Sequence, residues 1–253
     1  ANQNIDLDIK SIVVATGIKN APPAGDLLGY DRCANVITNT EFERLMNAGG
    51  PTAGHIIRPS DRQPARKIAW VQCAGRGLGE GRGTPYCSKV CCMIAAKQTI
   101  IAKEHDPSVA ATVFYNDLKA YGKGFWGFHR KALENGVRFV RARPYVVSED
   151  PGTHNLTVRY EDIDTGELRH QEVDLLVLST GLIPSERNDR LAKTLKLELD
   201  HLGFFKEKDP LLSPLETGVD GIYLCGGATG PIDIAESVAQ ATAAAMKAVC
   251  FQT

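Results

Sequence analysis

Four of the seven cysteines in this 253-residue chain are grouped in one short stretch, at Cys73, Cys87, Cys91 and Cys92. Thiolates are soft ligands, and four of them can surround a zinc ion or an iron–sulfur cluster. Zinc sites usually carry paired C-x2-C motifs, which this stretch lacks. The spacing therefore favours a cubane iron–sulfur cluster over zinc and over a set of redox-active or inert thiols, and it leaves these two alternatives open.

The sequence around these cysteines predicts a buried strand, a loop and a helix. Residues 67–72 form an apolar run typical of a strand, and residues 88–105 are rich in helix-forming types. The loop between them contains five glycines, at Gly75, Gly77, Gly79, Gly81 and Gly83. Such a loop lets Cys73 approach the other cysteines, and Cys87 and Cys91 are one helical turn apart.

Three other apolar runs end in glycines that leave room for a cofactor. These runs end in Thr16-Gly17, in Thr180-Gly181 and in Gly226-Gly227, and a helix is predicted after Gly230. Glycine at a strand end permits close approach of a ligand, and the first N–H groups of a helix can bind a flavin carbonyl or a phosphate. Each of these turns alone is explained equally well as an ordinary connection between a strand and a helix.

Strands alternate with helices along most of the chain, which predicts an α/β fold with a parallel sheet. A helix is predicted over residues 40–48, where Thr40 and Glu43 would form a capping box. Residues 144–174 are predicted to form a β-meander with a turn at Asp164-Thr165-Gly166.

The order of these turns resembles that of flavoproteins with two dinucleotide-binding domains. The resemblance implies that residues 1–66 and 182–253 form an FAD domain, split around an inserted Rossmann-like module at residues 67–181. The first strand of such a module should lead into a GxGxxG turn that binds NAD(P). Here it leads into Cys73-Ala74-Gly75-Arg76, so thiols take the expected nucleotide position. No strand with GxGxxG precedes residue 11, so the N-terminal ADP-binding βαβ unit is expected to be absent from this chain.

The cysteine stretch narrows the resemblance to one family. Val71 to Cys73, Tyr86 to Met93, Phe114 to Gly124 and Gly226 to Ile234 are similar to the A subunits of heterodisulfide reductases. The resemblance covers nearly the whole chain. It implies an oxidoreductase subunit that holds FAD, binds a [4Fe–4S] cluster through the four grouped cysteines, and relays electrons among flavin, cluster and partner subunits.

The same resemblance implies which residues contact the flavin. These are Thr16, Gly17, Thr180, Gly181, Gly226, Gly227, Gly230, Pro231, Asp233 and Ile234. Lys97 is expected near flavin N5, where a cation would stabilise the reduced, anionic flavin. The alternative for Lys97 is an ordinary solvated lysine on a helix.

The resemblance also predicts partners and a metabolic setting. The expected partners are B- and C-like subunits of heterodisulfide reductase, with the chain as a homodimer inside the larger complex. The chain has no ferredoxin-type C-x2-C-x2-C run. This points to the sulfur-oxidising branch, or to the related subunit of quinone-interacting oxidoreductases, rather than to the methanogen enzyme, and so to sulfur metabolism.

Two other functions remain open. In the first, the chain is an NAD(P)H-dependent flavin disulfide oxidoreductase that uses Cys91 and Cys92 as redox thiols, although no C-x2-C or GxGxxG motif supports it. In the second, it is a zinc-stapled assembly subunit with no catalytic role.

Composition sets the remaining limits. The net charge of −1 gives no reason to expect binding to nucleic acid or to an anionic membrane. No run of apolar residues is long enough to span a membrane, and the clustered, odd-numbered cysteines indicate reduced thiols. The chain is therefore predicted to be cytoplasmic, with any membrane association made through its partners. The isolated cysteines Cys33, Cys225 and Cys250 are expected to fill the core.

Overall fold

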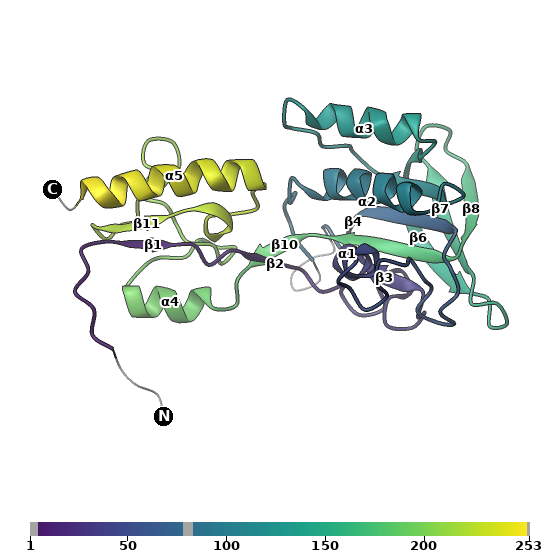
Figure 1. Ribbon diagram of the computed structural model, residues 1–253, viewed down its shortest axis with the longest axis horizontal. Helices are drawn as coiled ribbons and strands as arrows, with labels where there is room; N and C mark the ends of the chain where they lie inside the picture. Colours follow the sequence, from purple (N-terminus) through teal and green to yellow (C-terminus); the bar gives the residue numbers. More distant parts are fainter. Residues whose placement is uncertain (1–4, 78–82, 252–253) are drawn as a thin grey trace. The chain divides into compact units, whose positions relative to one another are not determined.

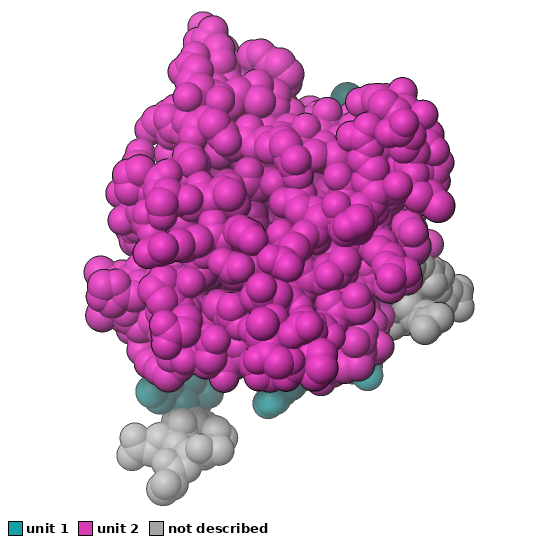
Figure 2. Space-filling view, turned by 90° about the vertical axis from the view of Figure 1, so that its right-hand side faces the viewer, with its two compact units in different colours: residues 1–19, 182–253 teal, residues 20–181 magenta. Residues whose placement is uncertain are grey.

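The computed structural model describes residues 5–77 and 83–251. The chain forms two compact units, which are coloured separately in Figure 2. Unit 1 contains residues 1–19 and 182–253, and unit 2 contains residues 20–181. Two of the loop glycines named above, Gly79 and Gly81, lie outside the described residues.

The secondary structure alternates between strands and helices along most of the chain (Figure 1). The strands are β1 (Ile12–Val14), β2 (Ile18–Asn20), β3 (Val36–Thr38), β4 (Lys67–Ala74), β5 (Ala110–Tyr115), β6 (Arg138–Glu149), β7 (Leu156–Asp162), β8 (Leu168–Val173), β9 (Leu175–Thr180), β10 (Leu182–Pro184) and β11 (Ile222–Leu224). The helices are η1 (Leu27–Gly29), α1 (Asn39–Met46), α2 (Cys91–His105), α3 (Phe125–Glu134), α4 (Asn188–Leu195), η2 (Gly226–Ala228) and α5 (Ile234–Cys250).

Unit 2 is built on a seven-stranded sheet of order β3-β9-β4-β5-β6-β7-β8. The strands from β3 to β6 are parallel, and β6, β7 and β8 form an antiparallel meander. Every residue of β9 is buried, as expected of a central strand in a parallel sheet that is covered on both faces. The predicted meander, with its turn between β7 and β8, is confirmed.

Alternate residues of β4 pack against opposite sides of this sheet. Ile68 and Trp70 belong to a core cluster that includes Phe42 of α1, together with residues of α2 and α3. Ala69 and Val71 belong to a second cluster, built with residues of the meander. Because neighbouring side chains of a strand point to opposite faces, the continuous apolar run of β4 supplies both cores at once.

Unit 1 has a smaller parallel pair, β1 with β11. Val14 and Leu224 pack with Phe205 in one core cluster. A second cluster joins the neighbouring residues of β11 to α5, which contributes Ala244 and Ala248. Alanine on this face of α5 lets the helix approach the strands closely.

The capping box of α1 differs from the predicted one. The helix begins at Asn39, and its N-cap is Thr38 rather than Thr40. The Glu41 amide N–H donates to Thr38 Oγ1 at 3.2 Å, and the Thr38 amide N–H donates to a carboxylate oxygen of Glu41 at 2.6 Å. Thr38 can act as the cap because it ends β3 in an extended conformation, which is the usual N-cap geometry. The prediction of a Thr40–Glu43 box was wrong, and Glu43 is left to bind other partners.

The two compact units divide the chain at residue 20 rather than at residue 67. Residues 20–66 pack with the predicted insert because β3 pairs with β9 and joins the large sheet. The second boundary, between residues 181 and 182, coincides with the predicted one. The assignment of one part to flavin and the other to an iron–sulfur site stays a prediction.

No helix within the described parts of the chain combines the length and the apolar character needed to cross a membrane.

A salt bridge in unit 1 provides a test of its packing. The Lys247 Nζ of α5 donates to Glu216 at 2.6 Å, and Lys208 Nζ lies 3.8 Å from the same carboxylate. The hydrogen bond and charge of Lys247 lower the pKa of Glu216, against a smaller effect of burial. A carboxyl group whose pKa is lower in the folded state than in the unfolded state stabilises the fold at pH values above its unfolded pKa. This stabilisation is lost as the pH falls through the folded pKa.

We therefore expect Glu216→Gln to lower the free energy of unfolding by about 0.5–1 kcal/mol at neutral pH. The difference from the parent should shrink as the pH falls below the unfolded pKa of about 4.3, and should vanish only below the lowered pKa of the folded state, where the carboxyl group is protonated in both states. Urea unfolding at several pH values measures this. A difference that did not change with pH would show that the charge of Glu216 contributes nothing.

Candidate functional site

The four grouped cysteines line one cavity in unit 2. Cys73 is the penultimate residue of β4, Cys87 precedes α2, and Cys91 and Cys92 begin α2. Ser179 and Gly181, at the end of β9, line the same cavity. The cavity is therefore at the carboxyl ends of parallel strands, which is where ligands bind in open α/β sheets.

The backbone of the loop is shaped so that Cys73 and Cys87 can meet. Cys73 and Lys89 both have left-handed conformations, with φ of 56° and 63°. A Cβ atom on Gly83 would lie only 1.6 Å from the Gly75 carbonyl oxygen, so only glycine permits the two ends of the loop to approach this closely. The Gly77 amide N–H also donates to the Thr84 carbonyl at 3.1 Å. Gly83 thus has a structural reason to be glycine beyond flexibility.

The site is closely packed on its β9 side as well. A Cβ atom on Gly181 would lie 2.6 Å from Thr84 Oγ1 and 3.1 Å from Ser88 Oγ. The Cys91 thiol donates to the Thr180 carbonyl at 3.5 Å, and the Cys92 thiol donates to the Asp117 carbonyl at 3.8 Å. The backbone at the end of β9 and just after β5 therefore accepts hydrogen bonds from these two thiols.

Burial dominates the electrostatics of the cavity. It raises the pKa of Cys91 to about 12, with smaller contributions from the thiolates of Cys92, Cys73 and Cys87. Burial likewise raises the pKa of Cys92 to about 11, although the Lys119 amide N–H opposes this by donating to the sulfur. Four thiolates in one desolvated space repel one another, so they need a strongly positive centre to become ionised together.

This donor set fits an iron–sulfur cluster in its chemistry. Four soft thiols line the same cavity. Among the described residues, no three side chains of His, Cys, Asp or Glu converge closely enough to hold one metal ion. A single zinc ion would need its four sulfurs within about 4 Å of each other, from a Zn–S bond of about 2.3 Å. The open space of this cavity is about 20 Å³.

Sequence reasoning missed several polar residues of this site. Asp117 and Lys119 line the cavity and form an ion pair with each other. Gln72 Nε2 donates to Ser179 Oγ at 3.0 Å, and within the described chain Gln72 Oε1 has no hydrogen-bond partner. Their place in the sequence could have indicated this, because Asp117 follows the end of a predicted strand, as Cys73 does.

Lys97 lies elsewhere on α2 and does not line the cavity. Its Nζ forms a salt bridge with Glu43 at 2.6 Å, and both side chains are 41% exposed. Gln98 Nε2 donates to the same carboxylate at 3.0 Å. Lys97 is therefore held in place by an anion of α1, and its approach to flavin N5 stays a prediction.

The other predicted flavin contacts are divided between the two units. In unit 2, Thr180 is 1% exposed, and its Oγ1 donates to Asn39 Oδ1 at 3.5 Å. In unit 1, Thr16 Oγ1 donates to Asn188 Oδ1 at 2.9 Å. Gly17 has a φ of 70°, which favours glycine. The hydrogen bond of Thr16 and the backbone conformation of Gly17 thus give each residue a local structural role. Their contact with a flavin stays a prediction.

The glycines after β11 also have local structural roles. A Cβ atom on Gly227 would lie 2.9 Å from Ile18 Cγ2, and the Gly226 amide N–H donates to Gln240 Oε1 at 2.7 Å. Asp233 is the N-cap of α5 and accepts from the Glu236 amide N–H at 2.8 Å. One of the N–H groups predicted to be free for a ligand is thus bound by Asp233. Gly230, Pro231 and the exposed Ile234 remain predicted contacts.

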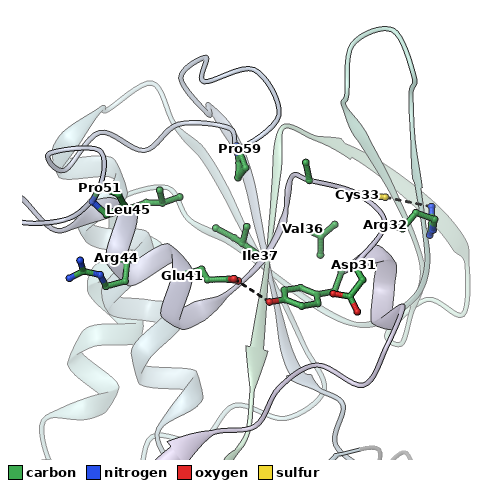
Figure 3. Close-up of a pocket in the computed structure, with 12 residues that line it drawn as sticks. Asp31, Arg32, Cys33, Val36, Ile37, Glu41, Arg44, Leu45, Pro51 and Pro59 are labelled. Atoms are coloured by element: carbon green, nitrogen blue, oxygen red, sulfur yellow. Dashed lines mark hydrogen bonds between the residues drawn. The ribbon is translucent and has the colours of Figure 1, made fainter.

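A second cavity of unit 2 lies beside β3 and α1, with a volume of about 600 Å³ (Figure 3). The Tyr30 hydroxyl group donates to Glu41 Oε1 at 3.1 Å across it. Cys33 lies in its wall and is buried, which raises the pKa of that thiol. None of the predicted cofactor residues, all of which the structure describes, lines this cavity. Of the isolated cysteines, Cys33 and Cys225 are buried as predicted, whereas Cys250 at the end of α5 is exposed, so the prediction for Cys250 was wrong.

Curated relatives share this sequence over nearly its whole length, although no protein-family model matches it. The iron-sulfur A subunit of CoB–CoM heterodisulfide reductase from Methanocaldococcus jannaschii is 45% identical over 96% of this chain and 37% of that protein. The A subunit of the H2:CoB–CoM heterodisulfide, ferredoxin reductase from Methanothermobacter thermautotrophicus is 41% identical over 97% of this chain and 37% of that protein. The chain therefore spans little more than a third of these relatives.

Solved structures show the same fold at much lower identity. Thioredoxin reductase of T. acidophilum has a TM-score of 0.58 and 17% identity, and the match covers 95% of this chain and 65% of that one. Thioredoxin reductase of Lactococcus lactis has a TM-score of 0.57 and 16% identity, with the same two coverages. This similarity confirms the predicted α/β flavoprotein fold. Over the segment that it spans, the chain is similar in sequence to the A subunits of heterodisulfide reductases.

Proposed function

We propose that this chain relays electrons between FAD and a [4Fe–4S] cluster, within a heterodisulfide-reductase-like complex of sulfur metabolism. The observation that carries the proposal is the convergence of four thiols on one cavity at the carboxyl edge of a parallel sheet. In open α/β sheets this edge binds the ligand, and here the first strand leads into a cysteine instead of a GxGxxG turn. A relative that is named as an iron-sulfur subunit supports the same interpretation.

In this proposal, some residues of the chain would bind the cofactors and others would keep water away from them. FAD exchanges one or two electrons and a [4Fe–4S] cluster exchanges one, so together they convert between two-electron and one-electron chemistry. Cys73, Cys87, Cys91 and Cys92 would each ligate one iron. The burial of Cys92 and the close packing at Gly181 would keep water from the site.

The end of β9 would contribute to both proposed cofactor sites. The Thr180 carbonyl accepts the hydrogen bond of Cys91, and Gly181 lines the cysteine cavity. The same two residues are predicted flavin contacts. Thr180 and Gly181 would then contribute to both proposed sites.

Partners and setting belong to the same proposal. B- and C-like subunits would exchange electrons with the cluster, in a complex that contains two copies of this chain. The complex would be cytoplasmic, with membrane contact only through its partners. The sulfur-oxidising branch stays a prediction, because the chain spans 37% of its relatives and motifs outside this segment bear on the choice.

The anaerobically purified protein is expected to contain about four irons and four sulfides per chain, with bound FAD. Its absorption spectrum should show flavin bands on a broad shoulder near about 400 nm. Iron, sulfide and flavin assays on the same sample measure the stoichiometry. A colourless, iron-free protein would contradict the proposal.

The same sample separates the two alternatives. Zinc without iron or labile sulfide would indicate the zinc-stapled assembly subunit. Reduction of the flavin by NADH or NADPH, with a disulfide between Cys91 and Cys92 as the electron acceptor, would indicate the disulfide oxidoreductase. The electron-relay proposal predicts neither result.

A further inference from the structure

A charged pair lies beside the cysteine cavity, on the loop that follows β5. Asp117 and Lys119 both line the cavity and form an ion pair. The Lys119 side chain is 30% exposed, whereas that of Asp117 is 57% exposed. The two side chains carry opposite charges, so they act on the cavity with opposite signs.

Lys119 is fixed against the cysteines by its backbone as well as by its side chain. Its amide N–H donates to the Cys92 sulfur, and the Cys92 thiol donates in turn to the Asp117 carbonyl at 3.8 Å. Lys119 and Cys87 line the same cavity, and the negative charge of a Cys87 thiolate would attract the ammonium group. A cation held in this way stays near the sulfur atoms, unlike a lysine on a free surface loop.

We propose that Lys119 sets the reduction potential of the metal centre held by Cys73, Cys87, Cys91 and Cys92, and that Asp117 moderates its effect. This inference rests on the proposed function. One electron taken from an external reductant makes the site one unit more negative. A nearby cation stabilises that added charge and therefore raises the potential, because net charge around a cluster is one determinant of its potential.

The test is a redox titration of the anaerobic protein with dithionite, followed by electron paramagnetic resonance. Lys119→Met removes the cation and leaves Asp117 uncompensated, so the midpoint potential should fall. The expected change is about tenfold in the one-electron equilibrium constant, or about 59 mV. Asp117→Asn should raise the midpoint, and the double variant should lie between the single variants.

Two controls separate this effect from a loss of structure. Lys119→Arg keeps the charge and should keep the parent potential. Lys123→Met removes an exposed lysine that is on the same loop but outside the cavity lining, and should also change nothing. Iron content is measured for every variant.

The outcomes distinguish this inference from the function on which it rests. Parent protein without iron overturns both. Full iron content with an unchanged midpoint in Lys119→Met overturns the role of Lys119 alone. If Lys119→Met fails to assemble the centre, the Asp117→Asn variant decides, because an unchanged midpoint in that variant also overturns the inference.

Discussion

Replacing Cys91 by alanine is expected to remove most of the iron, together with the absorption near about 400 nm that the cluster would give. Cys91 begins α2, and burial in the cavity raises its pKa to about 12. Cys91→Ala would leave three of the four thiols that would hold the cluster, and the Thr180 carbonyl, which accepts from the Cys91 thiol, is not a soft ligand. The iron content should fall from about four per chain to about one or less.

Cys250 provides the matched control for this substitution. It is exposed at the end of α5 in unit 1, so Cys250→Ala removes one thiol without touching the cavity. Cys33→Ala is the buried control, because Cys33 lies in a different cavity of unit 2. Both variants should keep the iron content of the parent.

The iron assay is accompanied by a measurement of folding. Circular dichroism and urea unfolding of Cys91→Ala should show that the sheet remains intact, because the change removes only one sulfur atom at the start of α2. Full iron content in a folded Cys91→Ala protein would exclude Cys91 as a ligand. It would leave three grouped thiols, too few for a cubane bound by four cysteines.

Much of unit 2 could be predicted from the sequence because its signals are local. Buried apolar runs predicted β4 and β9, and glycine and aspartate predicted the turn of the meander between β7 and β8. The grouped cysteines were predicted to share a site because a strand, a flexible loop and a helix start bring them together. The structure places all four on one cavity.

The errors arose where two local signals competed or where a contact joins distant segments. Both Thr38 and Thr40 precede a glutamate by three residues, and the sequence alone does not show which one ends a strand. The pairing of β3 with β9 joins residues 36–38 to residues 176–178, so it could not be read from local patterns. That pairing is the reason why residues 20–66 belong to unit 2.

The polar part of the site was missed for a related reason. Asp117 and Lys119 look like ordinary loop residues, because charged side chains are common after strands. Only the parallel order β9-β4-β5 places the loop after β5 beside Cys73. In a parallel sheet, residues that follow neighbouring strands meet at one edge, so the missing information was the strand order.

Replacing Trp70 by alanine is expected to lower the free energy of unfolding by about 4–6 kcal/mol. Trp70 is fully buried in β4, and its ring packs edge-on against Phe42 with centroids 5.1 Å apart. Its Nε1 donates to Gln98 Oε1 at 3.0 Å. The substitution would leave a large cavity and a buried carbonyl oxygen without its donor, a loss comparable with the whole stability of many domains.

Trp126 is the matched control, as the only other tryptophan of the chain. It is 59% exposed on α3, so Trp126→Ala should change the free energy of unfolding by less than about 1 kcal/mol. Urea unfolding followed by circular dichroism compares the variants without relying on tryptophan fluorescence. An equal effect of the two substitutions would contradict the packing of unit 2 described above.

Trp70→Phe keeps the test informative if the alanine variant does not fold. It retains most of the ring volume and loses the hydrogen bond to Gln98, so we expect a loss of about 1–3 kcal/mol. Trp70 pairs in register with Val177, three residues before Thr180, and the same strand delivers Cys73 to the cavity. If Trp70→Phe unfolds at lower urea but binds iron as the parent does, the tryptophan stabilises the sheet that carries the cysteines and has no direct part in holding iron.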